Sequence, residues 1–295
     1  MGILPGLPQD RCLVMGVVNV TPDSFSDGGR WFDPGVAAEH GLELVRAGAD
    51  LVDVGGESTR PGAQPVDRAE ELRRVVPVVR RLADAGVRVS VDTMWAETAE
   101  QALSAGAAIV NDVSGGRADP AMVPLVAEAE VPFVVMHWRA HSPRMQEHTN
   151  YGDVVADVLA ELTAQRDLVA AAGVDPTRII LDPGLGFSKT GEQNWELLAN
   201  LDRFVDLGHR LLVAASRKGF LGALLADEVG PRPADDRDDA TVALSTLAAA
   251  AGAQVVVARE ATNSNRAHLA EATLEDIDRY FGRVVPLAEA EGMFA

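Results

Sequence analysis

The stretch that decides the fold is residues 86–112, which read GVRVSVDTMWAETAEQALSAGAAIVND. A short β-branched run, Val87–Val91, leads into a polar turn and then into the amphipathic segment Ala96–Ala105. Gly106 follows as a left-handed helix cap would, and a second apolar run, Ala108–Val110, comes next. A strand, a helix and a strand in this order predict one β-α-β unit with parallel strands.

The same order of strand, polar turn and helix recurs along the chain. Short continuous apolar runs, suited to parallel strands buried on both faces, are predicted at Leu13–Val18, Leu51–Val54, Val87–Val91, Ala108–Val110, Phe133–Met136, Ile179–Leu181, Leu211–Ala214 and Val255–Val257. Amphipathic helices are expected at Asp67–Ala85, Ala96–Ala105, Tyr151–Ala172 and Asn194–Leu207. Left-handed glycine caps are expected at Gly48, Gly86, Gly106, Gly173 and Gly208.

Eight strands that alternate with helices predict a (β/α)8 barrel, the TIM barrel of the α/β class. No change in composition marks a boundary, so we expect residues 1–295 to form a single domain. A doubly wound sheet is the alternative fold, but no Gly-x-Gly-x-x-Gly motif follows the first strand.

Composition limits the classes of function. The 26 basic and 44 acidic residues give a net charge of −18, which argues against nucleic-acid binding because that needs a basic surface. The long uncharged stretch Ala240–Ala258 is too rich in alanine for a bilayer, so no membrane span is expected. Met1–Pro8 lacks the basic start of a secretion signal, and Cys12 is the single cysteine. These features predict a soluble, cytoplasmic protein.

In a barrel of this kind, the residues that end each strand line the site. Those positions carry Asn19, Asp53, Asp92, Asn111 with Asp112, Met136 with His137, Asp182, and Ser216 to Lys218. A series of strand ends with amides and carboxylates could form a donor and acceptor array for a flat heterocycle, with Lys218 meeting a carbonyl or an anion. Asp53 and Asp112 could equally be structural and accept hydrogen bonds from neighbouring turns.

Two loops have the composition of anion sites. Gly55-Gly56 and Ser58-Thr59-Arg60 offer backbone N–H groups, hydroxyls and a guanidinium to a phosphate. Asn19 and Asp23 form a sparse set of hard oxygen donors, which suits Mg²⁺ shared with a substrate phosphate. Taken alone, a loop rich in Gly, Ser, Thr and Pro is equally typical of an ordinary connection.

Other patterns favour structural interpretations. Residues 184–190 superficially resemble a phosphate-binding P-loop, but Ser188 stands where that motif requires glycine. His137, His141 and His148 lack a Cys or carboxylate at ligand spacing, which favours solvated or hydrogen-bonded histidines over a metal cluster. The acidic run Asp235–Asp239 is expected to be a solvated helix start.

The motifs, taken in order, resemble the dihydropteroate synthase family of pteridine-binding (β/α)8 barrels. The two most specific matches are residues 19–29, NVTPDSFSDGG, and residues 53–62, DVGGESTRPG. They are followed by Ser90–Thr93, Asn111–Val113, Met136-His137, Asp182–Gly184 with Gly186, Phe187 and Lys189, and Ser216–Lys218. The resemblance begins at Cys12 and covers nearly the whole barrel.

The family joins 6-hydroxymethyl-7,8-dihydropterin diphosphate to the amine of 4-aminobenzoate and releases diphosphate, on the way to folate. The resemblance implies catalytic roles for Asp92, Asp182, Lys218 and Arg60. It implies substrate binding by Thr59, Asp92, Asn111, Met136, Asp182, Phe187, Lys189, Ser216, Lys218 and Arg259, with Phe187 and Lys189 flanking the aminobenzoate channel. It also implies Mg²⁺ held by Asn19 against the diphosphate, and a homodimer.

This assignment is chemically consistent. Diphosphate leaves well when Mg²⁺ and cations neutralise its developing charge. Its departure leaves a cation at the pterin methylene, which a buried Asp92 or Asp182 could stabilise before the neutral arylamine attacks. Closure of the loops after the first two strands would exclude water, which would otherwise consume the electrophile.

The last strand departs from the family pattern. Where the family has Arg-Val-His, a cationic pair that holds diphosphate, this chain has Val257-Ala258-Arg259. We expect Arg259 to replace the missing charge, because strand alternation would keep it on the same face as Val257. Arg266 is a second candidate, and pairing of Arg259 with a carboxylate such as Glu260 is the alternative.

Two other functions stay open. A divergent paralogue could keep the pterin pocket and couple another amine, or lack synthase activity. A pterin-binding module could serve corrinoid-dependent methyl transfer, although diphosphate and aminobenzoate loops have no purpose there and no cobalamin-binding segment is visible.

Overall fold

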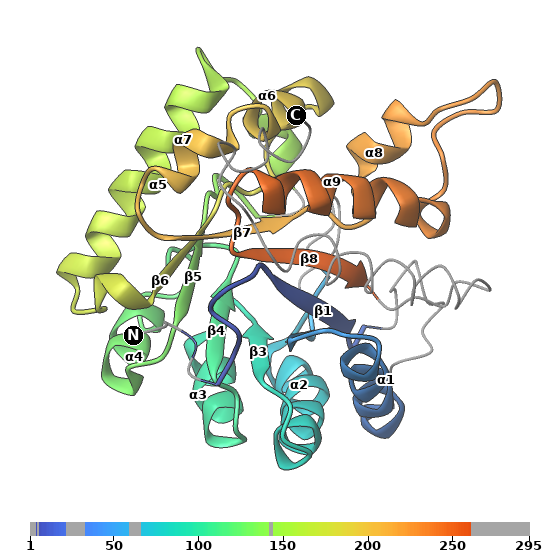
Figure 1. The fold of residues 1–295 in the computed structure, drawn as a ribbon. Helices are drawn as coiled ribbons and strands as arrows, with labels where there is room; N and C mark the ends of the chain where they lie inside the picture. Colours follow the sequence, from blue (N-terminus) through green and yellow to red (C-terminus); the bar gives the residue numbers. More distant parts are fainter. Residues whose placement is uncertain (1–3, 5, 22–32, 59–65, 142–143, 261–295) are drawn as a thin grey trace.

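The computed structural model describes residues 4, 6–21, 33–58, 66–141 and 144–260, with 258–260 described by their backbone. Within these ranges, eight parallel strands close into a barrel in sequence order, and β8 pairs with β1 (Figure 1). The strands are β1 (Leu13–Asn19), β2 (Leu51–Gly55), β3 (Val89–Asp92), β4 (Ile109–Asp112), β5 (Phe133–Met136), β6 (Ile179–Asp182), β7 (Arg210–Ala214) and β8 (Val255–Glu260). The predicted (β/α)8 barrel is confirmed, while the expected single domain over residues 1–295 extends beyond the described ranges.

Helices lie between the strands and cover the outside of the barrel (Figure 1). They are α1 (Pro34–Arg46), α2 (Arg68–Asp84), α3 (Ala96–Ser104), α4 (Met122–Ala129), α5 (Val154–Ala171), α6 (Gly191–Leu198), α7 (Leu201–Val205), α8 (Gly219–Leu224) and α9 (Asp238–Ala250), with 3₁₀ turns at Met145–His148, Pro176–Arg178 and Ala234–Asp236. Among the described residues, none of these helices is long and apolar enough to cross a membrane.

Local sequence accounts for where the helices end. The five glycines expected as left-handed caps all have φ between 75° and 108°: Gly48, Gly86, Gly106, Gly173 and Gly208. The predicted helix Asn194–Leu207 is wrong in one respect, because it is divided into α6 and α7. At the break, the Asn200 side chain donates to the Glu196 carbonyl at 2.9 Å, and such a local bond competes with helix continuation.

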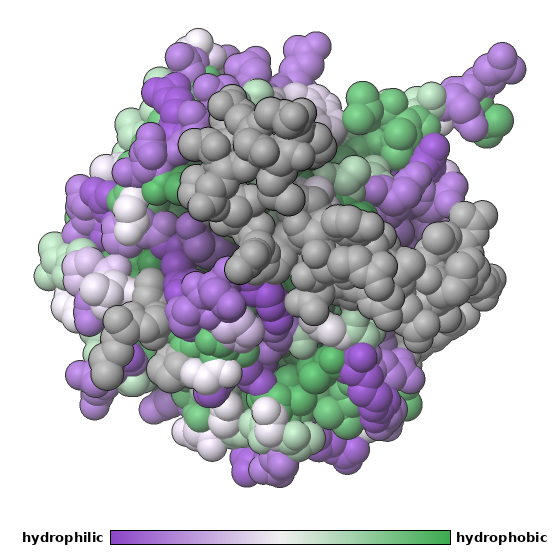
Figure 2. All heavy atoms as spheres, viewed as in Figure 1, coloured by the Kyte–Doolittle hydropathy of each residue, from purple (hydrophilic) through white to green (hydrophobic). Residues whose placement is uncertain are grey.

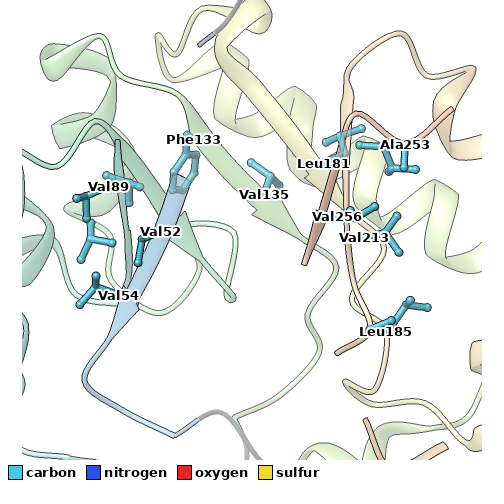
Figure 3. Close-up of a cluster of buried hydrophobic side chains, with 14 of the residues drawn as sticks. Val52, Val54, Val89, Phe133, Val135, Leu181, Leu185, Val213, Ala253 and Val256 are labelled. Atoms are coloured by element: carbon cyan, nitrogen blue, oxygen red, sulfur yellow. The ribbon is translucent and has the colours of Figure 1, made fainter. Parts of the chain in front are cut away.

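Strand alternation separates two apolar layers and thereby positions the site. Outward-facing residues, including Val52 and Val54 of β2 and Phe133 and Val135 of β5, form the layer under the helices (Figure 3). Inward-facing residues near the strand starts form a second cluster inside the barrel: Leu13, Met15, Leu51, Ile109, Val134, Ile180, Leu212 and Val255, together with Leu4. Two residues further along several strands, the inward positions carry Asp53, Asn111, Met136 and Asp182. The polar layer therefore lies at the carboxyl end of the barrel.

Candidate active site

Strand register brings several predicted site residues to one level at the carboxyl end of the barrel. Asn19 pairs with Gly55, Gly55 pairs with Asp92, and Asp92 pairs with Asn111. Elsewhere around the barrel, Met136 of β5 pairs with Asp182 of β6. Side chains that are far apart in the sequence are thus arranged around one opening.

Gly55 makes room for a carboxylate at this level. A Cβ at Gly55 would lie 3.2 Å from Asp92 Oδ2, closer than most real Cβ contacts. The missing side chain therefore lets the Asp92 carboxyl lie beside β2. The sequence identified Gly55 only as a source of backbone N–H groups.

The β2–β4 side of the opening is acidic. Asp53 is buried, and its Oδ2 accepts a hydrogen bond of 3.0 Å from Asn111 Nδ2. Burial raises the pKa of Asp53 and, aided by the nearby carboxylates Asp53 and Glu71, raises the pKa of Asp92 well above its usual value. Burial therefore favours the protonated form of Asp92, which is a hydrogen-bond donor.

Asp112 has a structural role. Its two carboxylate oxygens accept hydrogen bonds from the backbone N–H groups of Ser114 at 2.7 Å and Gly116 at 2.9 Å. The expectation that Asp112 could bond to a neighbouring turn is confirmed. Burial raises its pKa to about 6, which the hydrogen bonds from Ser114 and Gly116 oppose.

Asp182 combines burial with nearby cations. Its Oδ1 accepts a hydrogen bond of 2.7 Å from Gly184 N–H. Burial raises its pKa to about 6, whereas Lys218 and Lys189 act in the opposite direction. This residue can therefore change charge near neutral pH while it stays fixed by the backbone.

Lys218 lies against the loop that follows β6. Its Nζ donates to the Leu185 carbonyl and lies 4.8 Å from the centroid of the Phe187 ring. Phe187 also packs against an apolar cluster of Met94, Val113 and Met136. Lys218, Phe187 and Met136 thus combine a cation with apolar surface, as expected for an aromatic, charged ligand.

Lys189 differs from the expected channel residue. It is 3% exposed, and its Nζ is within hydrogen-bond distance of the Gly184 and Phe187 carbonyls and of His137 Nδ1. His137 is hydrogen-bonded to Glu161 as well, at 3.0 Å from Nε2 to Oε2. The interpretation of His137 as a hydrogen-bonded histidine is therefore confirmed.

Asn19 is the described residue whose chemistry fits the implied Mg²⁺. Its amide oxygen is a hard donor at the end of β1, and the second candidate, Asp23, lies outside the described residues. In the described ranges, no three His, Cys, Asp or Glu side chains gather as a metal site. One amide oxygen suits an ion that keeps most of its waters and takes other ligands from a substrate phosphate.

Parts of the predicted anion site lie outside the described residues. Thr59 and Arg60 fall in the gap at 59–65, and Arg266 falls in 261–295. Ser216 lies between β7 and α8, two residues before Lys218. The roles expected for these residues therefore stay predictions.

The register of β8 contradicts the alternation expected for Val257 and Arg259. Val257 is buried in the interior cluster and pairs with Met15, whereas the next pair joins Gly16 to Arg259. Ala258 is thus an extra residue in β8, as in a β-bulge. Since a bulge interrupts the two-residue period, alternation does not put Arg259 on the face of Val257.

Sequence reasoning missed the residues that hold the β7–α8 turn. Arg217 has φ +52°, and its guanidinium pairs with both carboxylate oxygens of Asp238, at 2.7 and 3.0 Å. Its N–H donates to Thr241 Oγ1 at 3.0 Å, and its carbonyl accepts from Arg237 Nη1 at 2.8 Å. Asp238, expected to be solvated, instead anchors the turn that carries Ser216 and Lys218.

Comparisons with known proteins give one family. The family model described as "Pterin binding enzyme" matches residues 15–258. A dihydropteroate synthase of Mycobacterium leprae is 58% identical over 242 residues, which are 81% of this chain and 85% of the relative. A dihydropteroate synthase of Bacillus subtilis is 42% identical, over 84% of this chain and 83% of the relative.

Solved structures agree with these relatives. The dihydropteroate synthase of Xanthomonas albilineans with 4-aminobenzoic acid has a TM-score of 0.80 and 41% identity, and the match covers 92% of both chains. The same protein in complex with 7,8-dihydropteroate has a TM-score of 0.77 and 38% identity, over 95% of this chain and 97% of that one. The chain belongs to the dihydropteroate synthase family of pterin-binding enzymes, which are transferases.

Proposed function

We propose that this chain joins 6-hydroxymethyl-7,8-dihydropterin diphosphate to 4-aminobenzoate and releases diphosphate, one step of folate biosynthesis. The observation that carries the proposal is the set of donors and acceptors at the carboxyl ends of the strands: Asp92, Asn111, Asp182 and Lys218. Family members solved with 4-aminobenzoic acid and with 7,8-dihydropteroate support the choice of substrates.

Two carboxyls, Asp92 and Asp182, bind the pterin in different ways. Burial raises the pKa of Asp92 well above its usual value, which favours its carboxyl as a donor to an acceptor of the pterin ring. Asn111, held by Asp53, supplies an amide. Asp182, ionised when the pterin binds, accepts from the ring's N–H groups, and Lys218 meets a ring carbonyl or nitrogen. Because Asp92 donates a hydrogen bond and Asp182 accepts one, the two carboxyls recognise different edges of the heterocycle.

Catalysis consists mainly of stabilising charge. The bond from the pterin methylene carbon to the diphosphate oxygen breaks, the arylamine nitrogen forms the new bond, and the amine loses one proton. The ionised Asp182 faces the positive charge that develops on the pterin, while Lys218 and Arg60 favour the departing anion. Mg²⁺ held by Asn19 would supply further neutralisation of the diphosphate.

The arylamine is proposed to bind between the β6–α6 and β7–α8 loops. Phe187 and Met136 offer apolar surface to its ring, and Ser216 and Thr59 offer hydroxyls. This placement is supported by the contact between Phe187 and Lys218, which joins the two loops.

Arg259 remains the proposed replacement for the missing cation at β8. The apolar, buried Val257 contributes no charge there, which supports a compensating residue nearby. Arg259→Ala should raise KM for the pterin diphosphate or lower kcat at least about tenfold, whereas Val257→Arg should leave activity intact or improve it. Unchanged kinetics of Arg259→Ala would instead favour the divergent paralogue.

A homodimer is proposed through α8 and α9. Leu224 of α8 is 63% exposed, Leu247 of α9 is 69% exposed, and Val229 of the intervening loop is exposed too. Figure 2 shows apolar atoms over α8, while the loop beyond it is mainly hydrophilic. Exposed apolar side chains of this size favour association. Light scattering should give the mass of two chains, and Leu224→Glu with Leu247→Glu should give one.

The proposed compartment is the cytoplasm. A diphosphate carries several charges and does not cross a bilayer unaided, so the enzyme must share a compartment with the enzyme that makes it. Fractionation of cells that express the chain should recover the activity with cytoplasmic markers.

The function is tested by measuring diphosphate release from the pterin diphosphate with a panel of arylamines, with and without Mg²⁺. Release that depends on 4-aminobenzoate and yields dihydropteroate is expected, and Asn19→Ala should lose turnover far more than pterin affinity. Full activity after EDTA treatment would remove the metal from the proposal. Release with a different amine alone would identify a divergent paralogue.

A further inference from the structure

Lys189 uses all its hydrogen-bonding capacity within the protein. Its Nζ lies 2.9 Å from the Gly184 carbonyl, 2.9 Å from the Phe187 carbonyl and 3.0 Å from His137 Nδ1. Burial lowers the pKa of Lys189 to about 7, so the ammonium form predominates below neutral pH. An ammonium has three N–H donors and no acceptor, so these three partners saturate that form. No donor is left for the carboxylate of an arylamine.

The ammonium also determines the tautomer of His137. Because Nδ1 accepts from Lys189, the ring proton must be on Nε2, which lies 3.0 Å from Glu161 Oε2. Burial, helped by the charge of Lys189, lowers the pKa of His137 to about 4. The imidazole is therefore neutral at physiological pH. It connects Lys189 to Glu161 of α5 through one hydrogen bond to each.

The contacts continue from Glu161 back to the starting loop. Arg139 binds both carboxylate oxygens of Glu161, and its guanidinium lies 3.7 Å from the centroid of the Tyr151 ring. The Tyr151 hydroxyl donates to the Ser188 carbonyl at 3.0 Å, one residue before Lys189. We call this closed set of residues the Lys189 ring: Lys189, His137, Glu161, Arg139, Tyr151 and Ser188.

The Lys189 ring fastens one loop to its neighbour. Ser188 and Lys189 belong to the β6–α6 loop, Arg139 and Tyr151 belong to the β5–α5 connection, and Glu161 lies on α5. Ser188 has φ +50°, a left-handed conformation that a non-glycine residue keeps only when its surroundings enforce it. The ring supplies that enforcement on both sides of the residue.

The use of lysine at position 189 also indicates that its three hydrogen bonds matter. The chain has two lysines, Lys189 and Lys218, and its other 24 basic residues are arginines. A planar guanidinium cannot direct three donors at the tetrahedral angles of an ammonium. At position 189 the three acceptors surround a single nitrogen, which explains why this chain uses lysine there.

We propose that Lys189 is a positioning residue: it fixes the β6–α6 loop, and with it Phe187, at the side of the opening where the arylamine binds, and it does not contact that substrate. This role replaces the direct aminobenzoate contact expected for Lys189. The part that concerns the arylamine rests on the proposed function, whereas the saturation of Nζ does not.

The saturation of Nζ is tested on the free protein by NMR. With ¹⁵N-labelled lysine only two side-chain signals exist, and Lys218→Met assigns them. Below pH 7, Lys189 should give an ammonium signal with slow solvent exchange, and His137 should be the Nε2–H tautomer. In Lys189→Met the pKa of His137 should rise because the neighbouring cation is gone. Fast exchange at Lys189, or an unchanged His137, would overturn the proposal.

The positioning role is tested by comparing 4-aminobenzoate with its neutral amide. Lys189→Met should lower kcat/KM for both amines by the same factor, on the order of tenfold, because misplacement of Phe187 affects the ring of either substrate. Glu161→Gln opens the Lys189 ring without touching Lys189 and should have the same effect if Lys189→Met does not fold. A loss confined to the carboxylate substrate would mean direct contact. An inactive wild type would instead contradict the proposed function and leave the NMR test in force.

Discussion

At the scale of single residues, burial and ligand recognition oppose each other at Asp182. Its carboxyl is buried, its pKa is raised to about 6, and a backbone N–H holds it in place. Asp182→Asn keeps the acceptor for Gly184 but removes the charge. Pterin binding should weaken by about 1–3 kcal/mol, the scale of a hydrogen bond to a charged group. Calorimetric titration with a pterin measures this, and unchanged affinity would exclude Asp182 from the pocket.

Gly186 controls the position of Lys218. It has φ +80°, and a Cβ there would lie 3.0 Å from Lys218 Cδ. Gly186→Ala should therefore displace Lys218 and lower kcat/KM, in addition to a strain of about 1 kcal/mol in the free energy of unfolding. Gly208→Ala is the matched control, because Gly208 has φ +75° and open space around it. Equal kinetics in the two variants, at equal stability, would contradict the contact with Lys218.

At the scale of elements, α9 determines the geometry of the β7–α8 turn. The Arg217 guanidinium binds both carboxylate oxygens of Asp238 at the start of α9. Asp238→Ala should relax the left-handed turn at Arg217 and lower kcat/KM through Ser216 and Lys218. Steady-state kinetics with both substrates give the effect.

The matched control for Asp238 is the adjacent residue on the same helix. Asp239 forms an ion pair of 3.0 Å with Arg232, and Asp239 is largely exposed. Such a pair contributes little to stability, so Asp239→Ala should leave turnover unchanged. If both variants lose activity alike, the loss reflects the start of α9 in general and the anchoring role of Asp238 is wrong.

Elements were predictable where a local pattern defines them. Continuous β-branched runs such as Phe133–Met136 predict buried strands, and glycines such as Gly106 predict where helices end. The extra residue at Ala258 was not predictable, because a bulge depends on pairing with β1. The Arg217–Asp238 pair joins residues 21 positions apart and exists only in the folded barrel.

At the scale of the whole molecule, the position of the site at the carboxyl ends of the strands was easier to predict than the contacts that its residues make. Strand ends converge in any parallel barrel, so Asp92, Asn111 and Asp182 could be grouped from their positions alone. The internal contacts of Lys189 could not be predicted, because two of its three acceptors are backbone carbonyls, which leave no trace in residue identity. The scarcity of lysine in this chain was the available signal.

The buried carboxyls also dominate how the whole molecule responds to pH. Burial raises the pKa of Glu71 to about 7 and of Asp112 and Asp182 to about 6, and raises that of Asp92 further above its usual value. The folded state therefore binds more protons than the unfolded chain through this range, so the free energy of unfolding falls as pH rises. His137, His209 and Lys189, whose pKa values burial lowers, oppose this trend, but the carboxyls with raised pKa values outnumber them.

The thermal midpoint should therefore fall as pH rises from 5.5 to 7.5, and Glu71 provides the sharpest variant. Glu71→Gln keeps an acceptor for Thr98 Oγ1 and removes a buried charge, so it should stabilise the protein at pH 8 by up to about 3 kcal/mol and have little effect at pH 5.

Glu70→Gln is the neighbouring control. Its partners Arg73 and Arg74 lower the pKa of Glu70 to about 2, so its loss should destabilise the protein equally at both pH values. A midpoint that rises with pH in the wild type, together with an identical response of the two variants, would mean that the buried carboxyls do not govern the stability of this barrel.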